Sequence, residues 1–447
     1  MKKLFSISLL FSVAAMMFTG CVSEEDDLFD SSAAERLMTS KKMYTDRLGG
    51  STWVMEFYPL NTDEAPKGQG YLILNKFNRD GSVVQAMQNE LTDGQYLTDT
   101  SLWEVISDQG TVLTFNTFNK CIHMFSDPGL YQTGQGFEGD YEFVILSLEE
   151  GAKYGMLKGK KRATYNRLTR LPDDVNFEEY LKDVTNFNLA FFPESAVNNS
   201  LFKIKDSLFV ISELYTGIMA MYPYGGDPIT QTEYHAYTTM KDTDGFYFRF
   251  REKLDIVDGV SVQLFKFDEA ACEFVCVDEG NPESKIFGYN KVDFFMEQLE
   301  IGHIWNINTN AVISDKFKEH ITVFDNAFKK NNISYRGLRL LKYAGKDGEP
   351  DRYVWRLAYQ QKGKGVSNLN YYYNVTPNGQ DVRCHYEGPE TSAGEQMLNV
   401  IDGISQVLTN DLSQEFVVES YTNAFVLNTL KFISVSDPDI WFTISLN

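Results

Sequence analysis

The stretch "GYLILNKFNRDGSVVQAM", residues 70–87, sets the pattern that most of the chain follows. Two short runs rich in β-branched and aromatic residues flank the dipeptide Asp80-Gly81. Such runs favour strands, and both residues of the dipeptide tolerate a positive φ angle. The pattern predicts an antiparallel hairpin with a two-residue turn.

Similar short strands are expected on both sides of this hairpin. "WVMEFYP" (53–59) precedes it, and further runs follow as far as "YGMLKGKK" (154–161). Turn signals recur about every 8 to 12 residues, which is typical of a β sandwich or barrel. We predict an antiparallel barrel or sandwich over residues 49–171, with a lipocalin-like barrel as one form because a tryptophan stands early in the first strand.

The β pattern breaks at "LPDD" (171–174) and then returns. A short acidic helix is expected around residues 177–184, followed by a second β-rich region over residues 190–300. Within that region, "FYFRFR" (246–251) alternates apolar and polar residues, which predicts a strand with one buried face and one solvated face.

Helices are expected among the strands of the last region, residues 301–447. Ser314 can cap a helix that places apolar residues on one face, and a second apolar stripe predicts another helix. The stripes consist of Phe317, Ile321, Phe324 and Phe328, and of Met397, Val400, Ile401, Ile404 and Leu408. The sequence as a whole therefore predicts a mainly β protein with an α+β C-terminal part, in which helices pack on an antiparallel sheet.

The first 20 residues have the pattern of a secretory signal. Lys2 and Lys3 precede the apolar run 4–18, which is shorter than the roughly 20 residues that a spanning helix needs. Cys21 follows Thr19-Gly20, and this ending resembles the bacterial lipobox. The resemblance implies that Cys21 becomes the lipidated first residue of the mature chain. The alternative is an ordinary secreted protein.

An acidic run directly follows Cys21. It consists of Ser23, Glu24, Glu25, Asp26 and Asp27. Four acids would keep a tether solvated and extended. The run resembles the export signal of Bacteroidetes lipoproteins, which implies a place on the outer membrane facing the cell exterior. A merely solvated linker is the alternative. A capping box at residues 32–35 predicts that a short helix completes the segment 21–48.

Composition excludes several kinds of partner and chemistry. The net charge of −21 disfavours binding to nucleic acid. Cysteine spacing gives no disulfide framework, and the five histidines are scattered without a ligand spacing, so we expect neither a metal nor a cofactor. No G-x-S-x-G elbow occurs, which leaves a serine hydrolase without local support. Asp140 and Glu142 are close enough in a strand to act as an acid pair, but a structural role is favoured.

One loop is a candidate for ligand binding. "YPYGGDP" (222–228) places Tyr222, Tyr224 and Asp227 on a segment rich in proline and glycine. Tyrosines beside a carboxylate could stack on and hydrogen-bond a sugar or a peptide. The alternative is that the loop folds its tyrosines onto its own sheet.

The order of elements in the first half resembles a known family. A lipidated cysteine and a short helix precede "WVMEFYP", "GYLILNKFNRDGSV", "GTVLTFNTFNKCIHMFSDP" and "GDYEFVI". This order resembles an uncharacterised domain-of-unknown-function family of Bacteroidetes surface lipoproteins. The resemblance implies a cell-surface lipoprotein, often encoded near starch-utilisation-type uptake systems, and it supplies no catalytic residues.

We therefore expect a non-enzymatic binding accessory in the capture of glycan or peptide nutrients. Its partners would be the membrane, through the lipid, and proteins of an outer-membrane uptake complex. The alternatives are an extracellular hydrolase with an unrecognised acidic active site and a structural or adhesive surface protein.

Overall fold

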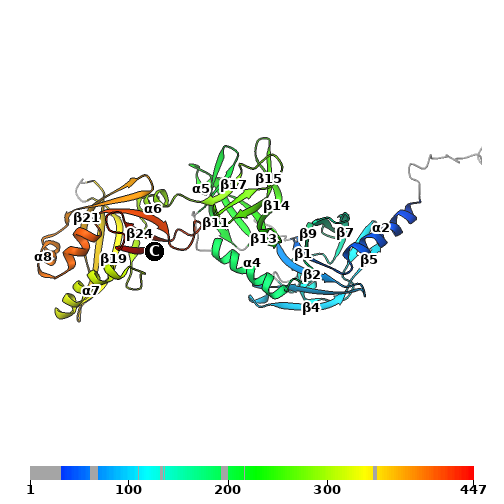
Figure 1. Ribbon diagram of the computed structural model, residues 1–447, viewed down its shortest axis with the longest axis horizontal. Helices are drawn as coiled ribbons and strands as arrows, with labels where there is room; N and C mark the ends of the chain where they lie inside the picture. Colours follow the sequence, from blue (N-terminus) through cyan, green and yellow to red (C-terminus); the bar gives the residue numbers. More distant parts are fainter. Residues whose placement is uncertain are drawn as a thin grey trace, which may run out of the picture.

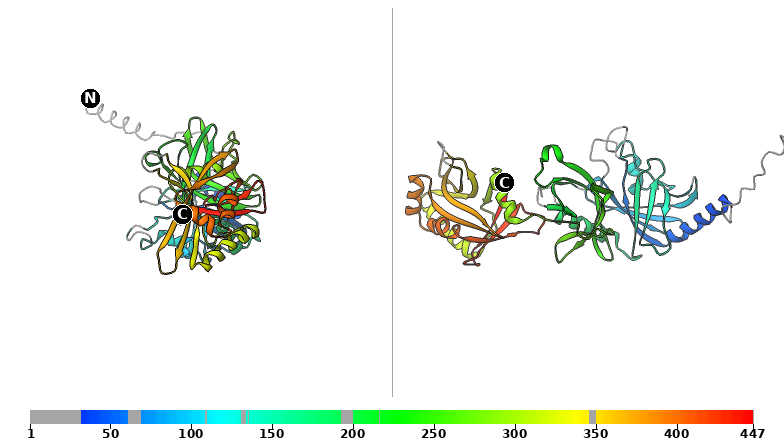
Figure 2. Two further views of the ribbon diagram at one scale, coloured as in Figure 1. Left: turned by 90° about the vertical axis from the view of Figure 1, so that its left-hand side faces the viewer. Right: turned by 90° about the horizontal axis from the view of Figure 1, so that it is seen from above.

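Three β domains follow one another in a row in the computed structural model (Figures 1 and 2). The structure describes residues 32–60, 69–108, 110–130, 134, 136–192, 200–215, 217–345 and 350–446. Cys21 and the acidic run 23–27 lie outside the described residues. Helix α2 (Ala33–Leu48) stands at one end of the row and the C-terminal domain at the other. The fold is mainly β, as the sequence predicts.

The first domain is a nine-stranded antiparallel meander in the order β4-β3-β2-β1-β9-β8-β7-β6-β5. Its edge strands β4 and β5 are separated along the chain by Trp103 alone, so the sheet curls round and brings the end of β4 next to the start of β5, although these two strands are not paired. The strands are β1 (Ser51–Phe57), β2 (Tyr71–Phe77), β3 (Ser82–Met87), β4 (Leu97–Leu102), β5 (Glu104–Ser107), β6 (Thr111–Thr114), β7 (Glu142–Ser147), β8 (Tyr154–Gly159) and β9 (Tyr165–Leu171). Short helices η1 (Glu90–Thr92), α3 (Lys120–His123) and η2 (Met124–Ser126) lie between strands. We call this domain the first barrel.

The hairpin of residues 70–87 forms, but its turn differs from the prediction. Gly81 has a φ of 88°, whereas Asp80 keeps a negative φ. The loop has three residues, 79–81, because the Asn78 N–H bonds the Ser82 carbonyl at 2.8 Å. Asp80 instead accepts hydrogen bonds from the Ser82 N–H and hydroxyl at 2.9 and 2.7 Å. These bonds select a turn that ends on a left-handed glycine rather than a two-residue turn.

The second domain is a closed eight-stranded barrel, and β10 pairs with β17 to complete it. Its strands are β10 (Ser200–Ile204), β11 (Ser207–Tyr215), β12 (Ile218–Pro223), β13 (Glu233–Asp242), β14 (Gly245–Val257), β15 (Val260–Asp268), β16 (Glu273–Cys276) and β17 (Lys285–Gly288). In β14 the predicted buried apolar face is confirmed, but the predicted solvated face is not. Phe248 and Phe250 are fully buried, but Arg249 on the opposite face is only 7% exposed. That face is not solvated because the first barrel covers it.

Helix α4 (Phe177–Phe191) bridges the first two barrels and is longer than the sequence suggested. Its Leu181 and Val184 pack on the outer faces of Val54 and Leu74 in the first barrel. Phe187, one turn later, joins the core of the second barrel. One amphipathic helix thus has its apolar face divided between two domains.

The third domain is also a closed eight-stranded barrel. Its strands are β18 (Trp305–Ile307), β19 (Ile333–Tyr343), β20 (Arg352–Gln361), β21 (Val366–Asn378), β22 (Asp381–Pro389), β23 (Glu415–Ser420), β24 (Thr429–Ser434) and β25 (Trp441–Leu446). Its helical segments are α6 (Lys291–Glu300), α7 (Asp315–Lys330), α8 (Ser392–Val400) and the π-helix η3 (Gln406–Asp411). Ser314 caps α7 as expected, but the predicted second helix is broken, since α8 ends at Val400 and the stripe continues in η3.

A loop of the third domain closes the gap to the second barrel (Figure 1). Phe425 is fully buried and belongs to the core cluster of the second barrel. Its ring centroid lies 5.8 Å from that of Phe191 and 5.9 Å from that of Phe274. Gly288 permits the approach, because a Cβ there would stand 1.9 Å from the Ala424 carbonyl oxygen. The second and third domains are therefore joined by a shared hydrophobic core, not by a flexible linker alone.

Among the described residues, no helix is both long and apolar enough to span a membrane.

Candidate functional site

A buried charge cluster joins the first barrel to the second. Glu56 alternates with Met55 and Phe57 on β1, so its side chain leaves the first barrel core and enters the junction, where it is fully buried. Its Oε1 accepts a hydrogen bond from the Thr238 hydroxyl at 2.8 Å and lies 3.5 Å from Arg249 Nη1. Its Oε2 lies 3.8 Å from Arg167 Nε. Two arginines from two domains thus neutralise one carboxylate.

Neighbouring groups extend this cluster. Because the Thr238 hydroxyl donates to Glu56, the Tyr58 hydroxyl donates to Thr238, at 2.9 Å. Burial, reinforced by the charge of Glu56, raises the pKa of Tyr58 well above its usual range, so the phenol stays protonated. Burial alone would lower the pKa of Arg249, but Glu56 and Tyr58 together outweigh it and the pKa is raised. The junction is therefore a fixed polar contact between the two domains.

A cleft of about 250 Å³ opens beside this cluster, between the first two barrels and α4. Thr238 belongs to both, since it lines the cleft and bonds Glu56. The residues that line the cleft are Gly70, Tyr71, Leu72, Gln88, Asn89, Glu90, Gly94, Leu181, Val184, Thr185, Asn188, Leu189, Gly217, Tyr237, Thr238 and Thr239. Small-molecule sites commonly lie at such domain interfaces and begin at about 300 Å³. At about 250 Å³ this cleft lies just below that range, so it suits a small ligand.

The cleft wall combines apolar side chains with neutral hydrogen-bonding groups. The Thr239 hydroxyl donates to the Asn188 side-chain oxygen across the wall. Gly70 is required there, because a Cβ would come within 2.2 Å of the Thr238 methyl group. The described lining residues include one carboxylate, Glu90, and no histidine, cysteine or lysine. Amides and hydroxyls can hold and orient a neutral ligand, but this lining offers no pair of groups for acid–base catalysis.

The predicted loop site lies at the other junction, between the second and third domains. Tyr222 is half-buried against the core of the third domain, and Tyr224 is 51% exposed. The Tyr224 hydroxyl is 3.5 Å from that of Tyr289, which donates to Glu297 at 2.6 Å. The two predicted tyrosines therefore lie near one interdomain contact, with Tyr222 taking part in packing.

Asp227 of the same loop caps the short helix α5 (Pro228–Gln231). Its carboxylate accepts from the Ile229 N–H at 2.9 Å and from the Thr230 hydroxyl at 2.8 Å. These local bonds lower the pKa of Asp227. The Asp227 carboxylate is therefore hydrogen-bonded within its own loop, where it caps α5.

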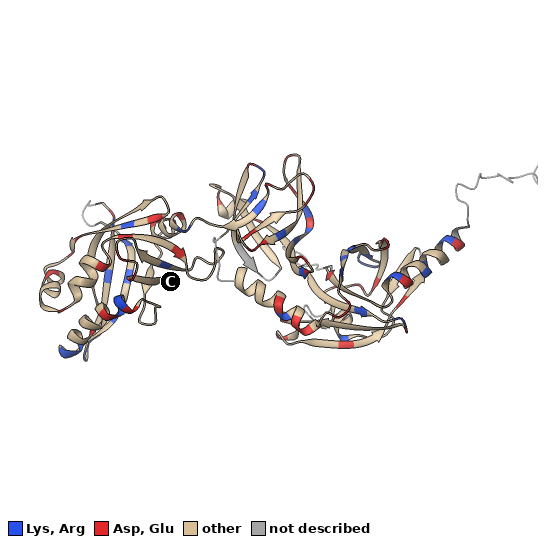
Figure 3. Cartoon of the chain, in the orientation of Figure 1, with Lys and Arg blue, Asp and Glu red and all other residues tan. Residues whose placement is uncertain are grey.

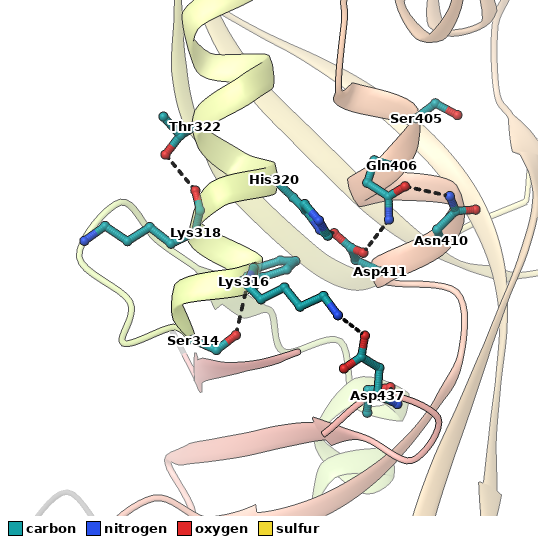
Figure 4. Close-up of polar contacts among 12 residues, drawn as sticks. Ser314, Lys316, Lys318, His320, Thr322, Ser405, Gln406, Asn410, Asp411 and Asp437 are labelled. Atoms are coloured by element: carbon teal, nitrogen blue, oxygen red, sulfur yellow. Dashed lines mark hydrogen bonds and ion pairs between the residues drawn. The ribbon is translucent and has the colours of Figure 1, made fainter. Parts of the chain in front are cut away.

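A polar cluster in the third domain ties α7 to η3 (Figure 4). His320 Nδ1 lies 2.8 Å from Asp411 Oδ2, and Asp411 also accepts from Gln406 at 2.9 Å. Burial raises the pKa of Asp411, although the bonds from Gln406 and His320 oppose the shift. Lys316 pairs with Asp437 beside it. A histidine and a buried carboxylate resemble part of a catalytic triad, but the nearby Ser314 hydroxyl is engaged by backbone N–H groups as a helix cap.

Other sequence candidates have structural roles. Asp140 accepts hydrogen bonds from the backbone N–H groups of Arg162 and Lys161 at 2.8 and 3.2 Å. It precedes β7, so it does not share a strand face with Glu142. Across the described part of the chain, no group of three or more potential metal ligands is brought together. Basic and acidic residues are intermixed on all three domains (Figure 3).

Comparison with known proteins assigns the chain to a family. No curated protein matches the chain. One solved structure with a partial likeness is a mutant of the vaccine antigen Transferrin Binding Protein B from Haemophilus parasuis Hp5, at 9% identity over 89% of this chain and 75% of that chain. Its TM-score is 0.16, which supports no inference about fold or function. The family model described as a domain of unknown function (DUF4302) matches residues 25–269, which span the first barrel and most of the second. Since the match covers more than half of the 447 residues, the chain belongs to this family.

Proposed function

We propose that the chain is a lipid-anchored protein of the outer cell surface that binds a neutral nutrient ligand, a glycan or a peptide, without catalysing its conversion. The cleft between the first two barrels carries this proposal. Its apolar side chains, amides and hydroxyls match a ligand that presents apolar faces and hydrogen-bonding edges. Its single carboxylate gives less support to the hydrolase alternative, since glycoside hydrolysis requires two placed carboxyl groups.

The arrangement of domains supports display away from a membrane. Helix α2 lies at one end of the row, next to the segment that carries Cys21 and the acidic run. The Glu56 cluster and the Phe425 contact would hold the three domains in a stiff row beyond the anchor. Proteins of an outer-membrane uptake complex are the partners that would accept the captured ligand.

Filling the cleft should weaken binding. Thr185 lines the cleft from α4, whereas the next residue, Asn186, is exposed and does not line it. We expect Thr185→Trp to weaken binding at least about tenfold, which corresponds to a loss of about 1.4 kcal/mol. Asn186→Trp should bind like the unchanged chain.

Binding is measured by probing glycan and peptide arrays with residues 22–447 and titrating the best hit against each variant. Retention of an unaltered ligand, lost in Thr185→Trp alone, supports the proposal. Equal binding by both variants would move the site away from the cleft, and release of a cleaved product would favour the hydrolase.

A further inference from the structure

An exposed column of three aromatic rings stands on the first barrel, between β6 and β7. Phe118 is 71% exposed and Tyr141 is 42% exposed. The His123 ring lies between them, with its centroid 5.5 Å from that of Phe118 and 4.8 Å from that of Tyr141. The His123 and Tyr141 planes are 24° apart, so these two rings are stacked. The outermost ring, Phe118, presents most of its surface to solvent.

The backbone fixes this column. His123 Nδ1 accepts a hydrogen bond from the Asn119 N–H at 3.2 Å. Asn119 is itself fully buried, and its side chain caps α3 through the Cys121 N–H at 2.9 Å. At the other end of the column, the Tyr141 carbonyl accepts from the Phe115 N–H at 3.2 Å. Burial lowers the pKa of His123, so the middle ring is neutral at neutral pH.

Stability of the barrel does not explain the position of Phe118. A phenylalanine at this exposure gives up most of the hydrophobic stabilisation that burial would provide. Its ring nevertheless lies against the His123 ring, with the two planes tilted by 38°. An exposed aromatic face that already rests on a neighbouring ring loses less side-chain entropy when a ligand binds it.

The groups around Phe118 indicate what the ligand offers. Asn116 and Thr117 directly precede Phe118 in the chain and are exposed, and the Asn116 amide donates to Glu104 Oε1 at 3.1 Å. An open ring face on a segment that also exposes an amide and a hydroxyl complements a sugar ring, which has an apolar C–H face and a rim of hydroxyl groups. Anionic ligands are disfavoured by the net charge of −21.

We propose that the Phe118–His123–Tyr141 column is a stacking site for the pyranose rings of a neutral polysaccharide. This site goes beyond the proposed function, because it lies on a different set of residues from the cleft and requires no occupant there. It would hold a long glycan against the first barrel. Phe118 would supply the contact, and His123 would be a positioning residue.

Affinity electrophoresis tests this site with residues 22–447 in native gels that contain amylopectin, galactomannan or xyloglucan. We expect at least one polysaccharide to slow the unchanged chain and Phe118→Ala to bind it about tenfold more weakly. Tyr165→Ala is the matched control, because Tyr165 is 56% exposed on the same barrel and lies outside the column.

Thr185→Trp separates the two sites, since it fills the cleft and leaves the column intact. Retardation that survives Thr185→Trp and is lost in Phe118→Ala supports the stacking site. Loss in Thr185→Trp with full retardation of Phe118→Ala would overturn the stacking site while supporting the cleft. Migration of the unchanged chain unaffected by all three polysaccharides would also overturn it.

Discussion

Glu56→Ala is expected to lower the free energy of unfolding of the first two barrels by about 3–5 kcal/mol. Glu56 is fully buried, and the side chains of Arg167 and Arg249 beside it are 9% and 8% exposed. Removing the carboxylate leaves two buried guanidinium groups without the anion that they share. It also removes the acceptor of the Thr238 hydroxyl, which forms part of the cleft wall.

Urea titration followed by tryptophan fluorescence measures this effect. Glu149→Ala is the control, because the Glu149 side chain is 81% exposed and its nearest cation lies 4.0 Å away, so its removal should change stability by less than about 0.5 kcal/mol. Equal unfolding midpoints for Glu56→Ala and Glu149→Ala would show that the charge cluster does not hold the junction together.

Phe425→Ala is expected to lower the free energy of unfolding of the second barrel by a similar amount, about 3–5 kcal/mol. The side chain comes from the third domain but is fully buried among Phe191, Phe192 and Phe274. Truncation leaves a cavity in the shared core. Because the lost contact joins two domains, the variant should also become less extended on average.

Chemical unfolding reports the stability change, and small-angle X-ray scattering reports the shape. Tyr421→Ala is the control in the same region, since Tyr421 is 43% exposed. A Phe425→Ala chain with the scattering profile and the unfolding midpoint of the control would contradict a shared core.

Local features of the fold were predictable from the sequence. The period-2 runs located strands, and the side chains of Ser32 and Ser314 located two helix starts. Barrel closure was not predictable, because it depends on pairs such as β18 with β25, whose residues are more than 100 positions apart in the chain. The turn at Asp80 has three residues instead of the predicted two because the Asp80 carboxylate accepts a hydrogen bond from the Ser82 N–H. The Asp-Gly pair alone does not reveal this bond.

The candidate site was harder to predict than the fold. Glu56 within the apolar run "WVMEFYP" and Arg249 within "FYFRFR" were visible signals, since charged residues in strands need a partner when buried. Their pairing joins residues 193 positions apart and appears only when two domains meet. The loop with Tyr222 and Tyr224 was chosen for its composition, but the same composition also serves domain packing.

Display of the barrels outside the cell, which we propose above, can be tested by labelling intact cells with a membrane-impermeant, amine-reactive biotin reagent. We expect the wild-type chain to be labelled while a periplasmic marker is not. Cys21→Ser should remove the chain from the cell surface, whereas Cys272→Ser should leave it there. A wild-type chain that is labelled only after the outer membrane is opened would contradict surface display.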